Sequence, residues 1–137
     1  MPNPPQRPKV LHVDGDTTAA KTLTAILRVF GYEAEHVYTA AEALVWCRLN
    51  WPDVVIADLA NETMDGIQLA EEIVSGQSSC KVLLLADPVV AATLLRDSNA
   101  ANHSFPILAK PVDPQKILDF LADVEAEATG LRRATTY

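Results

Sequence analysis

Three charged residues that can do chemistry each stand directly after a short apolar segment of the sequence. They are Asp14, Asp58 and Lys110, and Asp16 lies two positions beyond the first of them. Converging carboxylates attract hard divalent cations, and Mg²⁺ takes one or two carboxylates together with water and phosphate oxygens. A carboxylate can also attack phosphorus and form an aspartyl phosphate, while a lysine can hold a phosphoryl oxygen. This chemistry requires a fold that brings the ends of the three segments together.

Each of these residues has an ordinary interpretation when it is taken alone. A single Asp after a strand commonly forms a turn or caps a helix. A single Lys is usually a solvated surface charge, and the Lys-Pro pair at residues 110–111 by itself indicates only a loop. The placement of all three residues at segment ends is therefore what favours a shared site.

The residues around these positions alternate between strand and helix signals. The β-branched run at residues 53–57 lacks polar alternation, which indicates a strand covered by helices on both faces. Thr39 and Glu42 form a capping-box pattern that starts a helix ending near Asn50, and Gly31 is a helix stop. Five strands are predicted at residues 9–13, 33–37, 53–57, 81–85 and 105–108, and helices are predicted to start after Asp16, Thr39, Asp87 and Asp113 and near Gly66.

Five strands that alternate with five helices indicate an α/β fold with a doubly wound parallel sheet. In such sheets, ligands bind beyond the carboxyl ends of the strands, where the strand order switches. Asp14, Asp58 and Lys110 follow the predicted first, third and fifth strands, so this fold would place them at one edge of the sheet.

The composition indicates one globular domain of a soluble, cytoplasmic protein. The 137 residues match a common domain size, and the hydrophobic fraction of 49% can supply a core. The net charge of −7 disfavours nucleic-acid binding, and no apolar run approaches the ~20 residues of a membrane span. Cys47 and Cys80 have no zinc or disulfide spacing and are expected to be buried thiols. We expect a disordered leader at residues 1–8, a domain at residues 9–127 and a flexible tail or linker at residues 128–137.

Three longer motifs surround the charged residues. They are VLHVDGD at Asp14, PDVVIADLANETMDGIQLAEEI at Asp58 and ILAKPVDPQKIL at Lys110. The first resembles the acidic first-strand signature of response regulator receiver domains. The second is similar to the third strand, phosphoacceptor loop and third helix of that family, and the third is similar to its Lys-Pro strand end and fifth helix. The resemblance covers residues 9–126.

The resemblance implies a flavodoxin-like (βα)5 fold with strand order 2-1-3-4-5 and a set of roles at the site. Asp58 would accept a phosphoryl group as an aspartyl phosphate. Asp14, Asp58 and the backbone carbonyl of Ala60 would hold Mg²⁺, with Asp16 as a further candidate. Lys110 would contact the phosphoryl group. Such a domain is a signalling module and not an enzyme, because it catalyses only its own phosphorylation and dephosphorylation.

The resemblance also implies partners for the chain. A sensor histidine kinase, a phosphotransfer protein or a small phosphodonor would supply the phosphoryl group. The surface of the fourth helix, fifth strand and fifth helix would pass the signal to an output domain, a protein partner or a second copy in a homodimer. We expect no direct contact with nucleic acid or with a membrane.

Four positions depart from the family pattern and weaken the expected site. Gly15 replaces a second acid, so less negative charge attracts Mg²⁺, and Asp16 is also the predicted cap of the next helix. Ala86 replaces the Ser or Thr whose hydroxyl bonds the phosphoryl group, and Ile107 replaces the aromatic partner of that switch. Asp87 stands where the family has a small residue, and its negative charge would repel an incoming phosphoryl group.

Two alternatives to a phosphorylated receiver remain. One is a pseudo-receiver that binds partners without phosphorylation, because both switch residues are missing. The other is an enzyme, because Asp14 and Asp16 also resemble the Asp-x-Asp nucleophile motif of haloacid-dehalogenase-type phosphatases. Those enzymes need a further acidic pair on a strand after their lysine, whereas Lys110 is followed directly by the last predicted helix.

Overall fold

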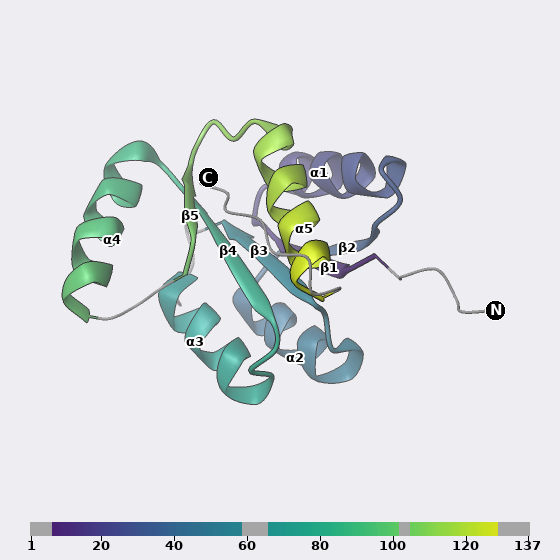
Figure 1. Ribbon diagram of the computed structural model, residues 1–137, viewed down its shortest axis with the longest axis horizontal. Coiled ribbons are helices and arrows are strands. Elements are labelled where there is room, and N and C mark those ends of the chain that lie inside the picture. The colour runs from purple at the N-terminus through teal and green to yellow at the C-terminus, as the bar shows by residue number, and fades with distance from the viewer. Residues whose placement is uncertain (1–6, 59–65, 102–104, 129–137) are drawn as a thin grey trace.

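A five-stranded parallel sheet forms the centre of the computed structural model, which describes residues 7–58, 66–101 and 105–128 (Figure 1). The strands are β1 (Lys9–Val13), β2 (Glu33–Val37), β3 (Val54–Asp58), β4 (Lys81–Ala86) and β5 (Ile107–Ala109). The helices are α1 (Thr17–Val29), α2 (Ala40–Asn50), α3 (Gly66–Gly76), α4 (Pro88–Ala101) and α5 (Pro114–Ala128). No helix in the described part of the chain is long and apolar enough to cross a membrane. The strand order is β2-β1-β3-β4-β5, so the predicted doubly wound α/β sheet and its order are confirmed.

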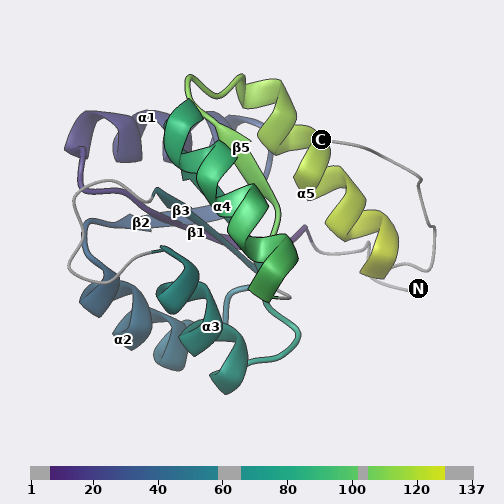
Figure 2. The same ribbon diagram turned by 90° about the vertical axis from the view of Figure 1, so that its left-hand side faces the viewer.

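Two hydrophobic layers hold the helices against the sheet. On one face lie α1 and α5, and on the other lie α2 and α3 (Figure 1, Figure 2). Val54 and Ile56 of β3 pack in the layer of α1 and α5, whereas Val55 and Ala57 pack in the layer of α2 and α3. Successive strand residues point to opposite faces, so a strand covered on both sides must be apolar throughout.

Local capping groups set where the first two helices begin and end. Asp16 accepts a hydrogen bond from the amide of Ala19 (3.1 Å) at the start of α1. Thr39 accepts one from the amide of Glu42 (3.1 Å) at the start of α2. Gly31 follows the end of α1 with a φ of 90°, a left-handed conformation that glycine adopts without strain. These helix signals in the sequence are confirmed.

Several boundaries and packing roles differ from the predictions. The third strand begins and ends one residue later than predicted, and the fifth is only Ile107–Ala109, because β5 pairs with β4 over those residues alone. The helical period of the sequence predicts Phe30 on the same apolar face as Leu23 and Leu27, but Phe30 ends α1 and is exposed. The sequence also predicts that Trp51 covers the sheet edge, but Trp51 ends α2 at a φ of 50° and is exposed.

The two cysteines are buried and unpaired, as the sequence predicts. Cys47 lies in α2 and Cys80 lies directly before β4. Burial raises the pKa of the Cys47 thiol to about 11 and that of Cys80 to about 12. Both thiols are therefore protonated at neutral pH, which makes them poor nucleophiles and poor metal ligands.

Candidate functional site

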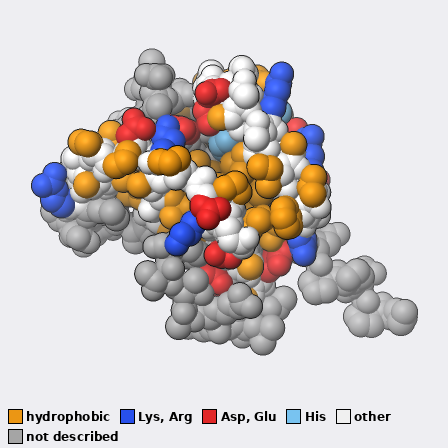
Figure 3. Space-filling model, turned by 90° about the horizontal axis from the view of Figure 1, so that it is seen from above, with side chains coloured by type: hydrophobic (Ala, Val, Ile, Leu, Met, Phe, Trp, Pro, Cys, Tyr) orange, Lys and Arg blue, Asp and Glu red, His pale blue; other side chains and the backbone are white. Residues whose placement is uncertain are grey.

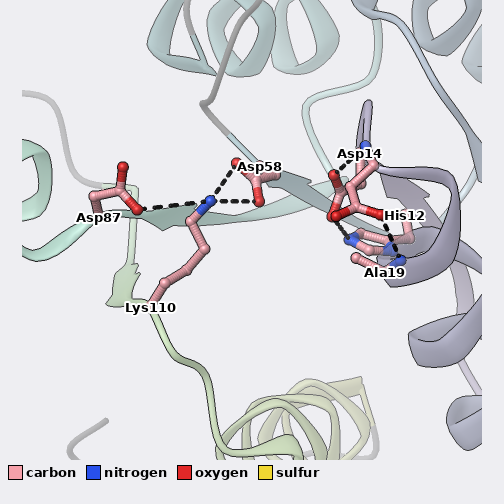
Figure 4. Close-up of polar contacts among 7 residues, drawn as sticks. His12, Asp14, Ala19, Asp58, Asp87 and Lys110 are labelled. Carbon is pink, nitrogen blue, oxygen red and sulfur yellow. Dashed lines mark hydrogen bonds and ion pairs between the residues drawn. The ribbon is translucent and has the colours of Figure 1, made fainter.

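The carboxyl ends of the strands bring four charged side chains to one edge of the sheet (Figure 4). In strand order across the sheet, these residues are Asp14 after β1, Asp58 at the end of β3, Asp87 after β4 and Lys110 after β5. All the strands are parallel, so their carboxyl ends share this edge. The central strand β3 places Asp58 between the acid from β1 and the two charges from β4 and β5.

Lys110 reaches Asp58 from the far side of β4. Its backbone amide donates a hydrogen bond to the carbonyl of Ala86 (2.7 Å), which fixes the start of the side chain beside the end of β4. The peptide bond between Lys110 and Pro111 is cis. From this anchor the side chain extends toward β3, where its ammonium group meets the Asp58 carboxylate (Figure 4).

The closest contact of the site is the ion pair between Lys110 and Asp58. Lys110 Nζ donates to both carboxylate oxygens of Asp58, at 3.0 Å for Oδ1 and 2.8 Å for Oδ2. The Asp58 side chain is only 9% exposed and that of Lys110 28% exposed. Burial alone lowers the pKa of Lys110, but its hydrogen bonds to Asp58 and the nearby negative charges raise this pKa overall. The ammonium group is therefore charged at neutral pH and neutralises Asp58.

A second carboxylate lies on the other side of the same ammonium group. Asp87 Oδ1 is 3.9 Å from Lys110 Nζ, and the Asp87 side chain is 68% exposed. Figure 4 shows the ammonium group between Asp58 and Asp87. The backbone carbonyl of Asp87 accepts a hydrogen bond from the amide of Ala91 (2.8 Å), which ties the residue to the start of α4.

Asp14 lies apart from this ion pair (Figure 4), and Asp16 is the N-cap of α1. Asp14 is buried, and its Oδ1 accepts a hydrogen bond from the amide of Asp16 (2.9 Å). Burial raises the pKa of the Asp14 carboxyl, the Asp16 amide opposes that shift, and the negative charge of Asp58 adds to it. The Asp16 carboxylate caps α1 through Ala19, so one of its oxygens is already engaged.

His12 also lies near this edge, although the sequence indicates only a structural or surface histidine at that position. It lies on β1 two positions before Asp14 and is 2% exposed. Its Nε2 is 3.6 Å from Asp14 Oδ2, too far for a good hydrogen bond. Burial lowers the pKa of His12 to about 4, so the ring is neutral at pH 7. The sequence feature that could have identified His12 is its place as a single polar side chain inside an otherwise apolar central strand.

The described residues at this edge provide few ligands for a magnesium ion. Asp14 and Asp58 provide two carboxylates, which is the number that Mg²⁺ commonly takes alongside water and phosphate oxygens. Among the described residues, no group of three or more Asp, Glu, His or Cys side chains could hold a metal together. Both Asp58 oxygens bond Lys110, so one would have to be released to a metal. Ala60, the third expected ligand, lies outside the described residues.

The remaining departures from the family pattern lie around this edge. Gly15 is exposed, and a Cβ there would make only an ordinary contact of 3.7 Å with the Tyr38 carbonyl. The backbone therefore has room for a side chain at this position. Ala86 is buried and has no hydroxyl, and Ile107 is a half-buried aliphatic residue packed against the core. These two positions cannot form a hydroxyl–aromatic pair.

Comparisons with known proteins agree on one family. The model of the response regulator receiver domain matches residues 10–122. The transcriptional regulatory protein GlrR of Escherichia coli is 33% identical over 116 residues, which are 83% of this chain and 25% of that protein. The DNA-binding response regulator MtrA of Mycobacterium tuberculosis is 28% identical over 113 residues, which are 82% of this chain and 48% of that protein. The chain thus spans about a quarter of the length of GlrR and about half of the length of MtrA.

Solved structures share the fold. A response regulator receiver domain from Clostridium thermocellum superposes with a TM-score of 0.78 at 23% identity, covering 90% of this chain and 98% of that one. The chemotaxis response regulator CheY4 of Vibrio cholerae superposes with a TM-score of 0.72 at 26% identity, covering 87% of this chain and 99% of that one.

Proposed function

Because this chain belongs to the response regulator receiver domain family, we propose that it signals in a two-component system by accepting a phosphoryl group on Asp58. The observation that supports this most is the pair of hydrogen bonds from Lys110 to Asp58 at the carboxyl edge of the sheet. These bonds offset the negative charge of the Asp58 carboxylate, the group that would act as the nucleophile. They also hold a cation where the phosphoryl oxygens would arrive.

In the proposed reaction, Asp58 acts as the nucleophile. One carboxylate oxygen attacks phosphorus, and the bond from phosphorus to the donor's leaving group breaks, with its electron pair remaining on the donor. The product is an acyl phosphate on Asp58. Lys110 gives up one of its two bonds to Asp58 and contacts a phosphoryl oxygen, where it offsets the added negative charge.

Asp14 and Asp58 would hold Mg²⁺ in this reaction, with the carbonyl of Ala60 and Asp16 as further candidates. When bound, the ion supplies positive charge to the phosphoryl oxygens. Asp14 is already oriented by the Asp16 amide, which leaves its Oδ2 without that contact (2.9 Å to Oδ1). Burial favours the protonated form of Asp14, so a cation would have to displace that proton at low pH.

The first test is labelling with a small phosphodonor. The whole chain would be incubated with acetyl phosphate and Mg²⁺ and followed by intact mass spectrometry. We expect a mass increase of one phosphoryl group in the native chain and none in Asp58→Asn, which keeps the size of the side chain but removes the nucleophile. The absence of labelling at saturating donor and Mg²⁺, or equal labelling of the variant, would contradict the proposal.

We further propose that the chain acts in the cytoplasm and that a sensor histidine kinase or a phosphotransfer protein is the physiological donor. The signal would leave through α4, β5 and α5, toward an output domain, a protein partner or a second copy. Val89 and Val90 at the start of α4 are exposed apolar side chains on that surface. Figure 3 shows hydrophobic side chains over this side of the molecule, with acidic and basic ones among them.

A pseudo-receiver is the second candidate function. It is favoured by one observation, namely that Ala86 and Ile107 offer no hydroxyl–aromatic pair to report a phosphoryl group. If this alternative holds, Asp58→Ala leaves partner binding and output unchanged, whereas the phosphorylated receiver requires that they be lost. The phosphatase alternative has no geometric support, because Lys110 bonds Asp58 and not Asp14.

A further inference from the structure

The ammonium group of Lys110 is shared between two carboxylates from neighbouring strands. Its contacts with Asp58 are 2.8 and 3.0 Å, and its contact with Asp87 Oδ1 is 3.9 Å. Asp58 and Asp87 lie on opposite sides of Nζ in Figure 4. The side of the ammonium group that faces away from Asp58 is therefore already next to a negative charge.

We infer that Asp87 is a positioning residue that holds Lys110 from the β4 side and competes with a phosphoryl group on Asp58 for this lysine. The inference rests on the proposed phosphorylation of Asp58. It gives Asp87 a definite effect, which is to slow the phosphorylation of this site. The competition follows from charge. Lys110 is the one described cation beside these two carboxylates, and it cannot fully neutralise both Asp87 and a phosphorylated Asp58.

The backbone keeps Asp87 beside Lys110. Ala86 accepts a hydrogen bond from the Lys110 amide (2.7 Å), and Asp87, the next residue, accepts one from the Ala91 amide (2.8 Å). The first bond ties Lys110 to the end of β4, and the second ties Asp87 to the start of α4. The distance between the two charged groups therefore does not depend on a freely moving loop.

Asp87 also changes where the negative charge of the site lies. Gly15 removes an acid beside Asp14, on the β1 side of Asp58, although the backbone there has room for a side chain. Asp87 adds an acid on the β4 side, next to Lys110. The negative charge of Asp87 therefore lies next to Lys110, where it competes with the phosphoryl group for the ammonium group. It does not lie beside Asp14, where it would attract a metal ion.

The size of the effect is limited by solvent, because the Asp87 side chain is 68% exposed. A charge in that position is partly screened by water and by salt. At the short range involved, removing it should speed phosphorylation by roughly fivefold and not by orders of magnitude. The gain should shrink as the salt concentration rises.

The test is the initial rate of acetyl phosphate labelling in Asp87→Asn and in Asp119→Asn. Asn keeps the size of the side chain and is as good as Asp at the start of a helix, so folding should be preserved. Asp119 is an exposed carboxylate of α5 that bonds Gln115 (2.9 Å) and serves as the matched control for net charge. We expect about fivefold faster labelling in Asp87→Asn, and the native rate in Asp119→Asn.

A double variant separates positioning from simple repulsion. If Asp87 acts through the lysine, the single variant Lys110→Gln and the double variant Lys110→Gln/Asp87→Asn should label at the same rate. Neither should label if the lysine is essential. Faster labelling of the double variant would overturn the inference, because Asp87 would then act directly on the phosphoryl group. An equal or slower rate in Asp87→Asn than in the native chain would overturn it as well, while labelling of the native chain would leave the proposed function standing. No labelling of Asp58 in any variant would remove the proposed function and this inference together.

Discussion

The individual residues of the site place the proposed nucleophile, Asp58, at the sheet edge with few supporting groups around it. Asp58 is almost buried and bonded by Lys110 through both oxygens. Asp14 lies apart and is itself shifted toward its protonated form by burial. Phosphoryl transfer depends largely on groups placed in advance around the developing charge. We therefore expect Asp58 to be phosphorylated more slowly than in receivers that keep the second acid and the hydroxyl.

Sequence reasoning could place these residues but not their side chains. Asp14, Asp58 and Lys110 directly follow predicted strands, and parallel strands end at one edge, so the sequence predicts that these residues lie near one another. The reach of Lys110 toward both Asp58 and Asp87 depends on side-chain torsions across three strands, which no local pattern encodes. The proximity of His12 to Asp14 was accessible, because residues two apart on a strand share a face.

His12 predicts a pH dependence of stability. Its pKa is lowered to about 4 in the fold by burial and is near 6.5 when the chain is unfolded. Between these values the unfolded chain binds a proton that the folded chain does not, so stability falls as the pH falls. From pH 7 to pH 5 this single group should cost about 2 kcal/mol of unfolding free energy.

Urea denaturation of the native chain and of His12→Val at pH 7 and pH 5 would check this. Other acids titrate in both proteins, so the difference between the two pH dependences isolates His12. We expect the variant to lose about 2 kcal/mol less than the native chain over this interval. An identical loss in both proteins would contradict the burial of a neutral His12.

At the scale of elements, capping residues and core periodicity define most of the helices and strands. Helix starts at Asp16 and Thr39 follow from side chains that accept amide hydrogen bonds. The ends are harder, because the ladder between β4 and β5 decides where β5 stops and no local signal contains it. Phe30 shows the same limit, since its apolar side chain fits the helical period but the helix ends before it.

Thr39 provides a test at this scale. Thr39→Ala removes the oxygen that accepts the Glu42 amide (3.1 Å), so one amide at the start of α2 loses its partner. We expect a loss of about 1 kcal/mol in unfolding free energy, measured by urea denaturation. Thr39→Ser keeps the acceptor and should stay near the native value. An equal loss in both variants would mean that the cap is not the cause.

For the whole molecule, the sequence was sufficient to predict the fold, because each level of pattern agreed with the others. Strands covered on both faces, capped helices and charged residues at strand ends all require the same doubly wound sheet. The function was harder to predict from the sequence, because Gly15, Ala86 and Ile107 differ from the residues that the family usually has at the site. Whether Asp58 is phosphorylated depends on the side chains around it at the sheet edge, and not on the fold.

The most direct test of the central claim is a structure of the chain with Mg²⁺ and beryllofluoride, a mimic of the phosphoryl group. We expect beryllofluoride on the Asp58 carboxylate and a magnesium ion held by Asp14 and Asp58. We also expect Lys110 Nζ to contact a fluorine atom while it remains near Asp87. If the site instead contains neither group at saturating concentrations, and Lys110 keeps both hydrogen bonds to Asp58, then Asp58 is not a phosphoacceptor.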